Sequence, residues 1–259
     1  ELVEKAFETT EVVVTASSQG KGEAINEMAV VSARQFTIEE SRRYAGARDD
    51  VSRMAANYAG VSGANDSRND IIIRGNSPLG LLWRMEGMDI PNPNHFGGFG
   101  STGGPVSVLN NNVLSNSDFY TGAFPAEYGN ALSGVFDLKM RNGNNEQYEF
   151  MGQIGFNGVE AGAEGPINRE KGSSFLANYR YSTLGLFDLV GISFGYVGIP
   201  QYQDLAFKVN LPNTKAGNFV IYGVGGTSSI SMLDSDREEG ELNITGSNQD
   251  LVNATTMGT

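Results

Sequence analysis

Short apolar runs separated by glycine and asparagine–proline turns fill residues 70–141. The runs cover Ile71–Ile73, Leu81–Met85, Met88–Ile90, 119–122 and 134–139. Short β-branched and aromatic runs with this punctuation are typical of strands joined by tight turns. The pattern therefore predicts a small sheet, with a turn at Glu86-Gly87 between the second and third strands.

Two helices are predicted before this sheet. Thr37 precedes two glutamates, which is the residue order of a helix N-cap followed by an acidic first turn. Four apolar residues recur at helical spacing, and Gly60 stands where a C-terminal cap belongs. They are Val51, Met54, Ala55 and Tyr58. This stripe indicates a helix face in the core and not a ligand site.

After residue 143 the pattern changes to alternating apolar and polar positions. Four runs show it: 148–157, 174–181, 204–211 and, less regularly, 219–227. Runs of about ten residues with one apolar and one polar face are typical of transmembrane β-barrel strands. Each run alone also fits half of a soluble sandwich. Their position after the small sheet favours the barrel.

Residues 181–200 contain a single charged residue, Asp188. Their length is close to the ~20 residues of a membrane-spanning helix. Repeated glycines and Pro200 make the stretch a poor helix former. We therefore expect a long apolar connection between strands.

The order of these motifs resembles the plug domain of TonB-dependent outer-membrane receptors, in a variant of the kind found in Bacteroidetes. The matching motifs are Ile73-Arg74-Gly75, Met85-Glu86-Gly87-Met88-Asp89-Ile90, Pro91-Asn92-Pro93, Tyr128-Gly129 and Gly134-Val135-Phe136-Asp137-Leu138. Each motif alone is unspecific, but their order across residues 70–141 is specific. The chain departs from the family at Thr121, where many relatives have arginine, and at Glu86, where aspartate is usual.

The resemblance implies three parts. Residues 1–16 would be an N-terminal segment, residues 17–143 an α+β plug with a small mixed sheet and short helices, and residues 144–259 the first antiparallel strands of an outer-membrane β-barrel. A plugged transporter barrel has about 22 strands, so we expect the barrel to be incomplete here, with room for about four or five strands. Short turns at 168–172 and 212–217 are typical of the periplasmic end. The family's strand order makes them extracellular, and the expectation follows that order.

Residues 11–15 form a β-branched run behind an acidic residue: Glu11, Val12, Val13, Val14 and Thr15. The resemblance implies that this run is the TonB box, which pairs as an added strand with a TonB-type periplasmic coupling protein. The run also fits the first strand of the plug. Both alternatives stay open.

The resemblance also implies roles for residues near the strand ends. Arg74 is expected to anchor the plug through an ion pair with a barrel carboxylate, which suits the guanidinium fork; an exposed strand-end charge is the alternative. Two loops are expected at the outward-facing plug apex, with ligand contacts from Asn76, Ser77, Asn94, His95 and Phe96. These groups suit a neutral or weakly polar ligand of the siderophore, glycan or peptide class. For His95, an ordinary solvated loop position is the alternative.

Composition excludes several function classes. A net charge of −12 argues against nucleic-acid binding. The chain has no cysteine for disulfides or cysteine catalysis, and a single histidine cannot form a metal site alone. No nucleophile elbow, zinc-binding helix or phosphate loop occurs in the sequence. We therefore expect no enzyme activity, no bound metal and no cofactor.

The predicted function is energy-coupled nutrient uptake by a receptor in the outer membrane of a Gram-negative cell, with the plug accessible from the periplasm. The expected partners are the coupling protein, outer-membrane lipid, the remainder of the barrel and, as a further candidate, a surface lipoprotein. The alternative is a soluble or surface-exposed β-rich binding or adhesion module without transport.

Overall fold

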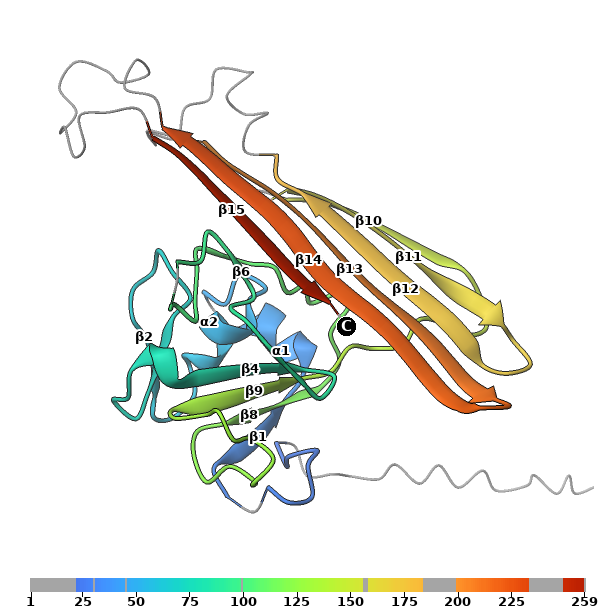
Figure 1. The fold of residues 1–259 in the computed structure, drawn as a ribbon, viewed down its shortest axis with the longest axis horizontal. Coiled ribbons are helices and arrows are strands. Elements are labelled where there is room, and N and C mark those ends of the chain that lie inside the picture. Colours follow the sequence, from blue (N-terminus) through green and yellow to red (C-terminus); the bar gives the residue numbers. More distant parts are fainter. Residues whose placement is uncertain are drawn as a thin grey trace, which may run out of the picture.

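The structure is a computed structural model that describes residues 22–29, 31–44, 46–98, 100–155, 158–183, 199–232 and 249–258. Within these ranges an N-terminal unit, residues 22–141, lies beside a sheet of six long strands (Figure 1). The predicted coupling segment, residues 11–15, lies outside the described residues, as does most of the apolar stretch 181–200. No helix within the described ranges is both long enough and apolar enough to cross a membrane.

A five-stranded mixed sheet forms the centre of the N-terminal unit. Its strands, in spatial order, are β1 (Ala33–Phe36), β8 (Ser117–Tyr120), β9 (Gly134–Leu138), β4 (Leu81–Met85) and β5 (Met88–Ile90). β4 and β9 are parallel, and the other neighbouring pairs are antiparallel. The predicted small mixed sheet is confirmed.

Two ribbons and a 3-10 turn complete this unit. β2 (Val61–Gly63) pairs with β3 (Ile71–Ile73), and β6 (Asn94–His95) pairs with β7 (Val106–Ser107). The 3-10 turn η1 (Pro78–Gly80) follows β3. β6 also contacts the six-stranded sheet, so the β6–β7 ribbon joins the two parts of the structure.

Both predicted helices are present, and both are short. α1 (Ile38–Arg43) begins with a capping box: the Thr37 hydroxyl accepts from the Glu40 N–H, and the Glu40 carboxylate accepts from the Thr37 N–H. α2 (Val51–Ala55) begins at Asp50, whose carboxylate accepts from the next amides. α2 ends before the predicted stripe does, because the chain continues as a turn in which the Tyr58 N–H donates to the carbonyl of Ala55. The stripe residues are buried as expected.

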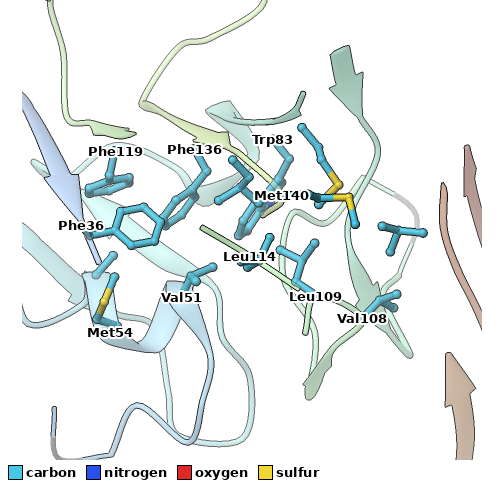
Figure 2. Packing of buried hydrophobic residues seen from close by; sticks show 14 of the residues in the cluster. Phe36, Val51, Met54, Trp83, Val108, Leu109, Leu114, Phe119, Phe136 and Met140 are labelled. Atoms are coloured by element: carbon cyan, nitrogen blue, oxygen red, sulfur yellow. The ribbon is translucent and has the colours of Figure 1, made fainter. Parts of the chain in front are cut away.

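The core of the N-terminal unit lies between the five-stranded sheet and the helices. The Phe136 ring stacks on Trp83 with centroids 4.5 Å apart and lies 4.4 Å from the Phe119 ring (Figure 2). Phe36 and Met54 close the cluster, and neither has exposed surface. Aromatic pairs at such distances stabilise beyond the area they bury. The cluster therefore fixes α2 against the central strands.

The second sheet contains six antiparallel strands in sequence order. They are β10 (Glu149–Gly155), β11 (Gly158–Asn168), β12 (Ser173–Tyr181), β13 (Ile199–Thr214), β14 (Gly217–Met232) and β15 (Gln249–Gly258). The estimate of four or five strands, made from the remaining chain length, was too low. The alternation pattern indicated four runs and did not reveal β11 or β15. The outward positions of β11 include Ala161 and Ala163, which carry too little apolar surface to show the alternation.

The two faces of this sheet differ in polarity. The face turned to the N-terminal unit contains buried charged side chains: Glu160, Glu164, Asp204 and Lys208. The opposite face exposes large apolar side chains: Phe150, Ile154, Tyr179, Tyr181, Leu205, Phe207, Phe219 and Ile221. The sheet is thus polar toward the protein and apolar toward its surroundings.

The connections between these strands also differ between the two ends of the sheet. Short turns at residues 169–172 and 215–216 join β11 to β12 and β13 to β14 (Figure 1). Residues 182–198 join β12 to β13, and residues 233–248 join β14 to β15. Because successive strands are antiparallel, the short turns share one end and the two longer connections share the other.

Candidate functional site

Buried charges concentrate where the polar face of the six-stranded sheet meets the N-terminal unit. Burying a charge is costly unless it is paired and hydrogen-bonded, so these side chains mark the contacts that hold the two parts together. Three groups of contacts can be distinguished, and each joins a loop or turn of the N-terminal unit to neighbouring strands.

The first group is centred on Asp204 of β13. Its Oδ2 lies 3.0 Å from His95 Nε2 of β6, and both residues are buried. The same oxygen accepts from Arg180 of β12 at 2.9 Å from Nε and 2.7 Å from a terminal guanidinium nitrogen. Arg180 also donates to the carbonyl of Ser107 in β7, at 2.5 Å. The Tyr202 ring lies 4.9 Å from the imidazole and covers this group.

The second group joins the turn between β4 and β5 to β13. Lys208 Nζ donates to Glu86 Oε1 at 3.1 Å and to the carbonyl of Met140 at 2.8 Å. Glu86 Oε1 also accepts from the Met140 N–H at 2.5 Å. Nearby, the Tyr222 hydroxyl of β14 donates to the carbonyl of Met85 at 3.0 Å. The side chains of Lys208 and Glu86 are only 6% and 17% exposed, so this ion pair is largely withdrawn from water.

The third group involves two glutamates of β11. Glu160 Oε1 accepts from the side-chain amides of Asn110 and Asn112, each at 2.6 Å. Glu164 Oε2 accepts from Arg141 at 2.6 Å. Glu160 thus contacts the loop between β7 and β8, and Glu164 contacts the segment that leads from the N-terminal unit into the sheet. The strand missed by the sequence pattern therefore supplies acceptors at this interface.

A polar cleft of about 610 Å³ opens beside these contacts. The N-terminal unit contributes Arg42, Arg48 and Arg53 to its lining, and the sheet contributes Glu160 and Arg180. Arginines, carboxylates and asparagines line it, so the cleft is polar and not an apolar pocket. Within the described residues, no cluster of three or more metal-binding side chains is present.

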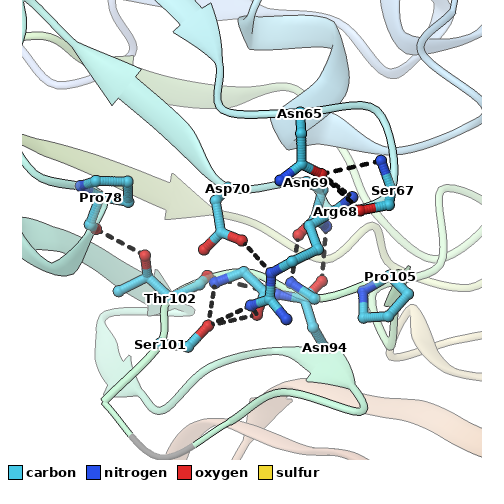
Figure 3. Close-up of polar contacts among 12 residues, drawn as sticks. Asn65, Ser67, Arg68, Asn69, Asp70, Pro78, Asn94, Ser101, Thr102 and Pro105 are labelled. Carbon is cyan, nitrogen blue, oxygen red and sulfur yellow. Dashed lines mark hydrogen bonds and ion pairs between the residues drawn. The ribbon is translucent and has the colours of Figure 1, made fainter. Parts of the chain in front are cut away.

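An amide network holds the loop that contains β6 from the opposite side. Asn69 Nδ2 donates to Asp50 Oδ2 and to Asn94 Oδ1, both at 2.7 Å, and Asn94 Nδ2 donates to Asn92 Oδ1 at 2.6 Å. Beside it, Arg68 binds Asp70, the Ser101 hydroxyl and the carbonyl of Gly103 (Figure 3). Burial raises the pKa of the Asp50 carboxyl although these donors and Arg53 oppose the shift. The N-cap of α2 is thus linked through amides to the His95 strand.

The five predicted ligand residues lie in two different environments. Asn76 and Ser77 are exposed beside η1, and Phe96 is half-buried. Asn94 and His95 are 1% and 0% exposed and make the internal contacts described above. In this conformation the second loop therefore presents Phe96 and its neighbours to solvent, while Asn94 and His95 hold the loop in place.

Arg74 lies on the surface with its backbone at a positive φ of 51°. Its guanidinium donates to the Ser32 hydroxyl at 3.0 Å and to the Thr121 hydroxyl at 3.3 Å. Among the described residues no carboxylate lies within ion-pair distance of it. Ser32 and Thr121 are thus the side-chain partners of its guanidinium.

Sequence reasoning did not identify Arg180, Asp204, Lys208, Glu160 or Glu164 as interface residues. A signal was present for three of them, since Arg180, Asp204 and Lys208 occupy polar positions of the alternating runs 174–181 and 204–211, where neutral residues would have satisfied the pattern. Glu160 and Glu164 lie in β11, which showed no alternation. Charges on the hidden face of an amphipathic strand need partners, but the sequence does not say which turn or loop supplies them.

No family model matches this chain, and no curated protein matches it. Solved structures of outer-membrane receptors are similar to it. The ferric enterobactin receptor PfeA is 16% identical over 82% of this chain and 35% of its own, with a TM-score of 0.47. The siderophore receptor PirA from Pseudomonas aeruginosa is 17% identical over 78% and 34%, with a TM-score of 0.46. The alcaligin receptor FauA from Bordetella pertussis is 12% identical over 85% and 37%, with a TM-score of 0.45.

These structures belong to the class that the sequence motifs resemble. The chain spans about a third of the length of the receptors named here.

Proposed function

We propose that this chain is the N-terminal part of a TonB-dependent outer-membrane receptor that takes up a nutrient by energy-coupled transport. In this proposal residues 17–143 are the plug and residues 144–259 are the first strands of the barrel. The observation that carries it is the polarity of the six-stranded sheet. Its charged face is buried against the N-terminal unit, and its aromatic and aliphatic face is exposed.

This polarity is the reverse of what a water-soluble sheet requires. A soluble sheet with one covered face buries its apolar side and leaves its polar side in water. An outer-membrane barrel strand turns its apolar side to lipid and its polar side to the lumen. With Phe150 and Ile154 at 81% and 85% exposure, the chain fits the second arrangement.

The strand count supports one orientation of the sheet. With β11 included, β10 and β11 run in opposite directions, so the turn at 169–172 lies at the end where β10 begins. If β10 rises from the periplasm, the short turns are periplasmic and the longer connections extracellular, which is the usual arrangement. The family's strand order and the turn lengths then agree for four connections, whereas the two-residue connection between β10 and β11 lies at the extracellular end despite its length.

The coupling step is assigned to residues 11–15 on the sequence alone. A β-branched run ahead of the plug can add as a strand to a TonB-type periplasmic protein through main-chain hydrogen bonds. A pulling force on residues 11–15 would be transmitted along the chain to Ile25 and Asn26, which are held by β8. The N–H groups of Ile25 and Asn26 donate to the Asp118 carboxylate at 2.8 and 3.0 Å, and the segment is thereby tied to β8.

For the ligand, we propose contact with the exposed loop residues Asn76 and Ser77 and with Phe96, and a neutral or weakly polar ligand of the siderophore, glycan or peptide class. Asn94 and His95 would act through the loop they hold. With the substrate identified, the combined change His95→Ala and Phe96→Ala should weaken binding to the full-length receptor at least tenfold, about 1.4 kcal/mol. Wild-type affinity would show that the loop has no part in binding.

The experiment that tests the proposed function compares two lysine substitutions in the full-length protein. Phe207→Lys places a charge on the exposed apolar face, and Ala216→Lys places one in a short turn that is already exposed. A lysine facing lipid near the bilayer centre costs about 2–4 kcal/mol, falling toward zero at the interfaces. We expect Phe207→Lys to reduce the fraction assembled in the outer membrane and Ala216→Lys to leave it unchanged.

The adhesion-module alternative gives a different result. A soluble protein would be extracted without detergent, and both lysines would be tolerated equally. Detergent-free recovery of a monodisperse wild-type protein would therefore reject the membrane receptor.

A further inference from the structure

We propose that His95 is a positioning residue that holds the β6–β7 ribbon against the six-stranded sheet, here called the wall, by binding the Arg180–Asp204 ion pair. We call this contact the lock, and we propose that it requires glycine at position 226. The inference deepens the proposed function and rests on it in one respect only: the ribbon carries the loop that we assign to ligand contact. The geometry of the lock itself does not depend on transport.

The wall presents one acceptor and one donor side by side. Arg180 of β12 and Asp204 of β13 are opposite each other in the strand register, and their side chains are paired at 2.7 Å. The Arg180 side chain is 15% exposed and the Asp204 side chain 3% exposed. Two nitrogens of the guanidinium donate to the same oxygen, Asp204 Oδ2, which fixes the two side chains relative to each other. The six-stranded sheet thus offers a preformed polar contact to the ribbon.

The ribbon meets this pair with one group from each of its strands. His95 and Val106 are opposite each other in β6 and β7, and so are Asn94 and Ser107. His95 Nε2 lies 3.0 Å from the Asp204 carboxylate, and the Ser107 carbonyl accepts from Arg180 at 2.5 Å. The donor on β6 faces the wall's acceptor, and the acceptor on β7 faces the wall's donor. Sliding or rotating the ribbon would break both contacts together.

A glycine in the wall makes room for the imidazole. A Cβ added at Gly226 of β14 would lie 2.7 Å from His95 Cε1 and 2.7 Å from the carbonyl oxygen of Gln203. Carbon atoms in contact normally lie about 3.5–4.0 Å apart. Any side chain at position 226 would thus displace the ring or the strand. The Phe96 N–H donates to the Ser228 hydroxyl at 3.4 Å, which adds a third contact on the same strand.

The far side of β6 is held by the amide network that begins at Asp50. The loop around His95 is therefore fixed at both sides, to α2 through Asn69 and Asn94 and to the wall through Asp204. His95 Nδ1 has no hydrogen-bond partner among the described residues. A buried polar atom left unpaired costs free energy, which fits a ring whose position is dictated by its contact with the wall.

The test measures release of the ribbon directly. The chain contains no cysteine, so Ser107→Cys introduces one thiol in β7, at a position only 8% exposed. Ser107 also lines the polar cleft, so the parent Ser107→Cys protein sets the basal labelling rate. In the detergent-solubilised full-length protein, with any cysteine outside this chain replaced, an increase of the maleimide labelling rate above this basal rate reports release of the ribbon from the six-stranded sheet. Four further changes are each combined with Ser107→Cys: His95→Leu, His95→Gln, Gly226→Ala and Gly152→Ala.

We expect His95→Leu and Gly226→Ala to raise the labelling rate at least tenfold. His95→Gln should stay within twofold of the parent, because its amide nitrogen can occupy the place of Nε2 and donate to Asp204. Gly152→Ala should also stay within twofold, because that glycine of β10 has open space around its Cβ position.

Three results would overturn the proposal. Unchanged labelling in His95→Leu would show that the histidine does not hold the ribbon. Equal acceleration in His95→Gln and His95→Leu would make the effect one of ring packing. Equal acceleration in Gly152→Ala and Gly226→Ala would make it a general response of the sheet. None of these labelling measurements uses uptake or a ligand. The proposed role of His95 can therefore be rejected while the proposed receptor function is kept, and the receptor function can be rejected while the role of His95 is kept.

Discussion

Replacing Lys208 by methionine is the sharpest test of how the N-terminal unit is held. Methionine keeps most of the apolar stem and removes the ammonium group. Glu86 then loses its ion-pair partner at 3.1 Å, and the Met140 carbonyl loses a donor at 2.8 Å. The backbone N–H of Met140 still donates to Glu86 Oε1, so the carboxylate keeps one hydrogen bond.

The expected cost follows from the burial of the two side chains. Removing one partner of a fully buried ion pair costs about 3–5 kcal/mol, because the other charge is left uncompensated. Glu86 is 17% exposed and keeps one donor, which reduces the penalty. We therefore expect about 2–3 kcal/mol in the local opening free energy of the β4–β5 turn. This corresponds to about 30- to 140-fold faster opening.

Hydrogen exchange at the Glu86 amide measures this opening. That N–H donates to the Leu138 carbonyl at 2.9 Å and is released when the turn leaves its place. The measurement uses the full-length protein in detergent. The double variant Lys208→Met with Glu86→Gln should return to within about threefold of wild type, because no unpaired charge remains and replacing both partners is close to neutral.

Arg43→Met is the matched control for this test. Arg43 and Glu39 form an ion pair at 3.3 Å with side chains 80% and 77% exposed, and exposed pairs contribute little. It should leave exchange at Glu86 unchanged. Exchange in Lys208→Met within threefold of wild type would refute the reasoning, as would a double variant that exchanges as fast as the single one.

Three further predictions concern other parts of the chain. Val13→Pro removes a backbone donor from residues 11–15, so uptake should be lost while ligand binding by the full-length receptor is kept; unchanged uptake would reject the coupling role. Arg74→Lys keeps the charge but loses the planar fork, so amide exchange in the plug should rise, and wild-type protection would reject an anchoring role. Burial raises the pKa of Asp50, so the folded state holds this proton more tightly than the unfolded state. That contribution is present below the unfolded pKa and is lost as pH rises through the folded pKa. Relative to Asp50→Asn, wild-type opening free energy at the α2 amides should therefore increase as pH is lowered from 7 toward 4, and parallel pH profiles would contradict this.

Local rules predicted the elements of the N-terminal unit well. The capping box at Thr37 and the strand runs between glycine turns depend on residues close in the chain, so the sequence contains the needed information. Periodicity also found four strands of the second sheet, β10, β12, β13 and β14, but not β15. It did not find β11, because the small residues on one face of that strand give no apolar signal while its glutamates face the interface.

The candidate site depended on contacts that no local pattern encodes. His95 was expected to face a ligand because the resemblance places its loop at the outward-facing apex of the plug. Its actual neighbour, Asp204, is 109 residues away, and the seat for its ring exists because Gly226 lacks a side chain. Pairing of this kind is set by the register of β6 and β7 against β12 to β14. Sequence periodicity gives the face of a strand but not its neighbour across an interface.

The turn at Glu86 shows how a departure from local preference can indicate such a contact. Glu86 and Gly87 have φ values of 49° and 86°, the sign pattern of a type I′ hairpin turn. Asparagine, aspartate and glycine are favoured at the first of these positions, because other side chains are strained there. A glutamate is retained at that cost, and its carboxylate extends to Lys208 on the opposite sheet. A charged residue that is disfavoured by its backbone conformation and largely buried needs a stabilising contact outside its own hairpin. For Glu86 that contact is the ion pair with Lys208, which joins the five-stranded sheet to the six-stranded sheet.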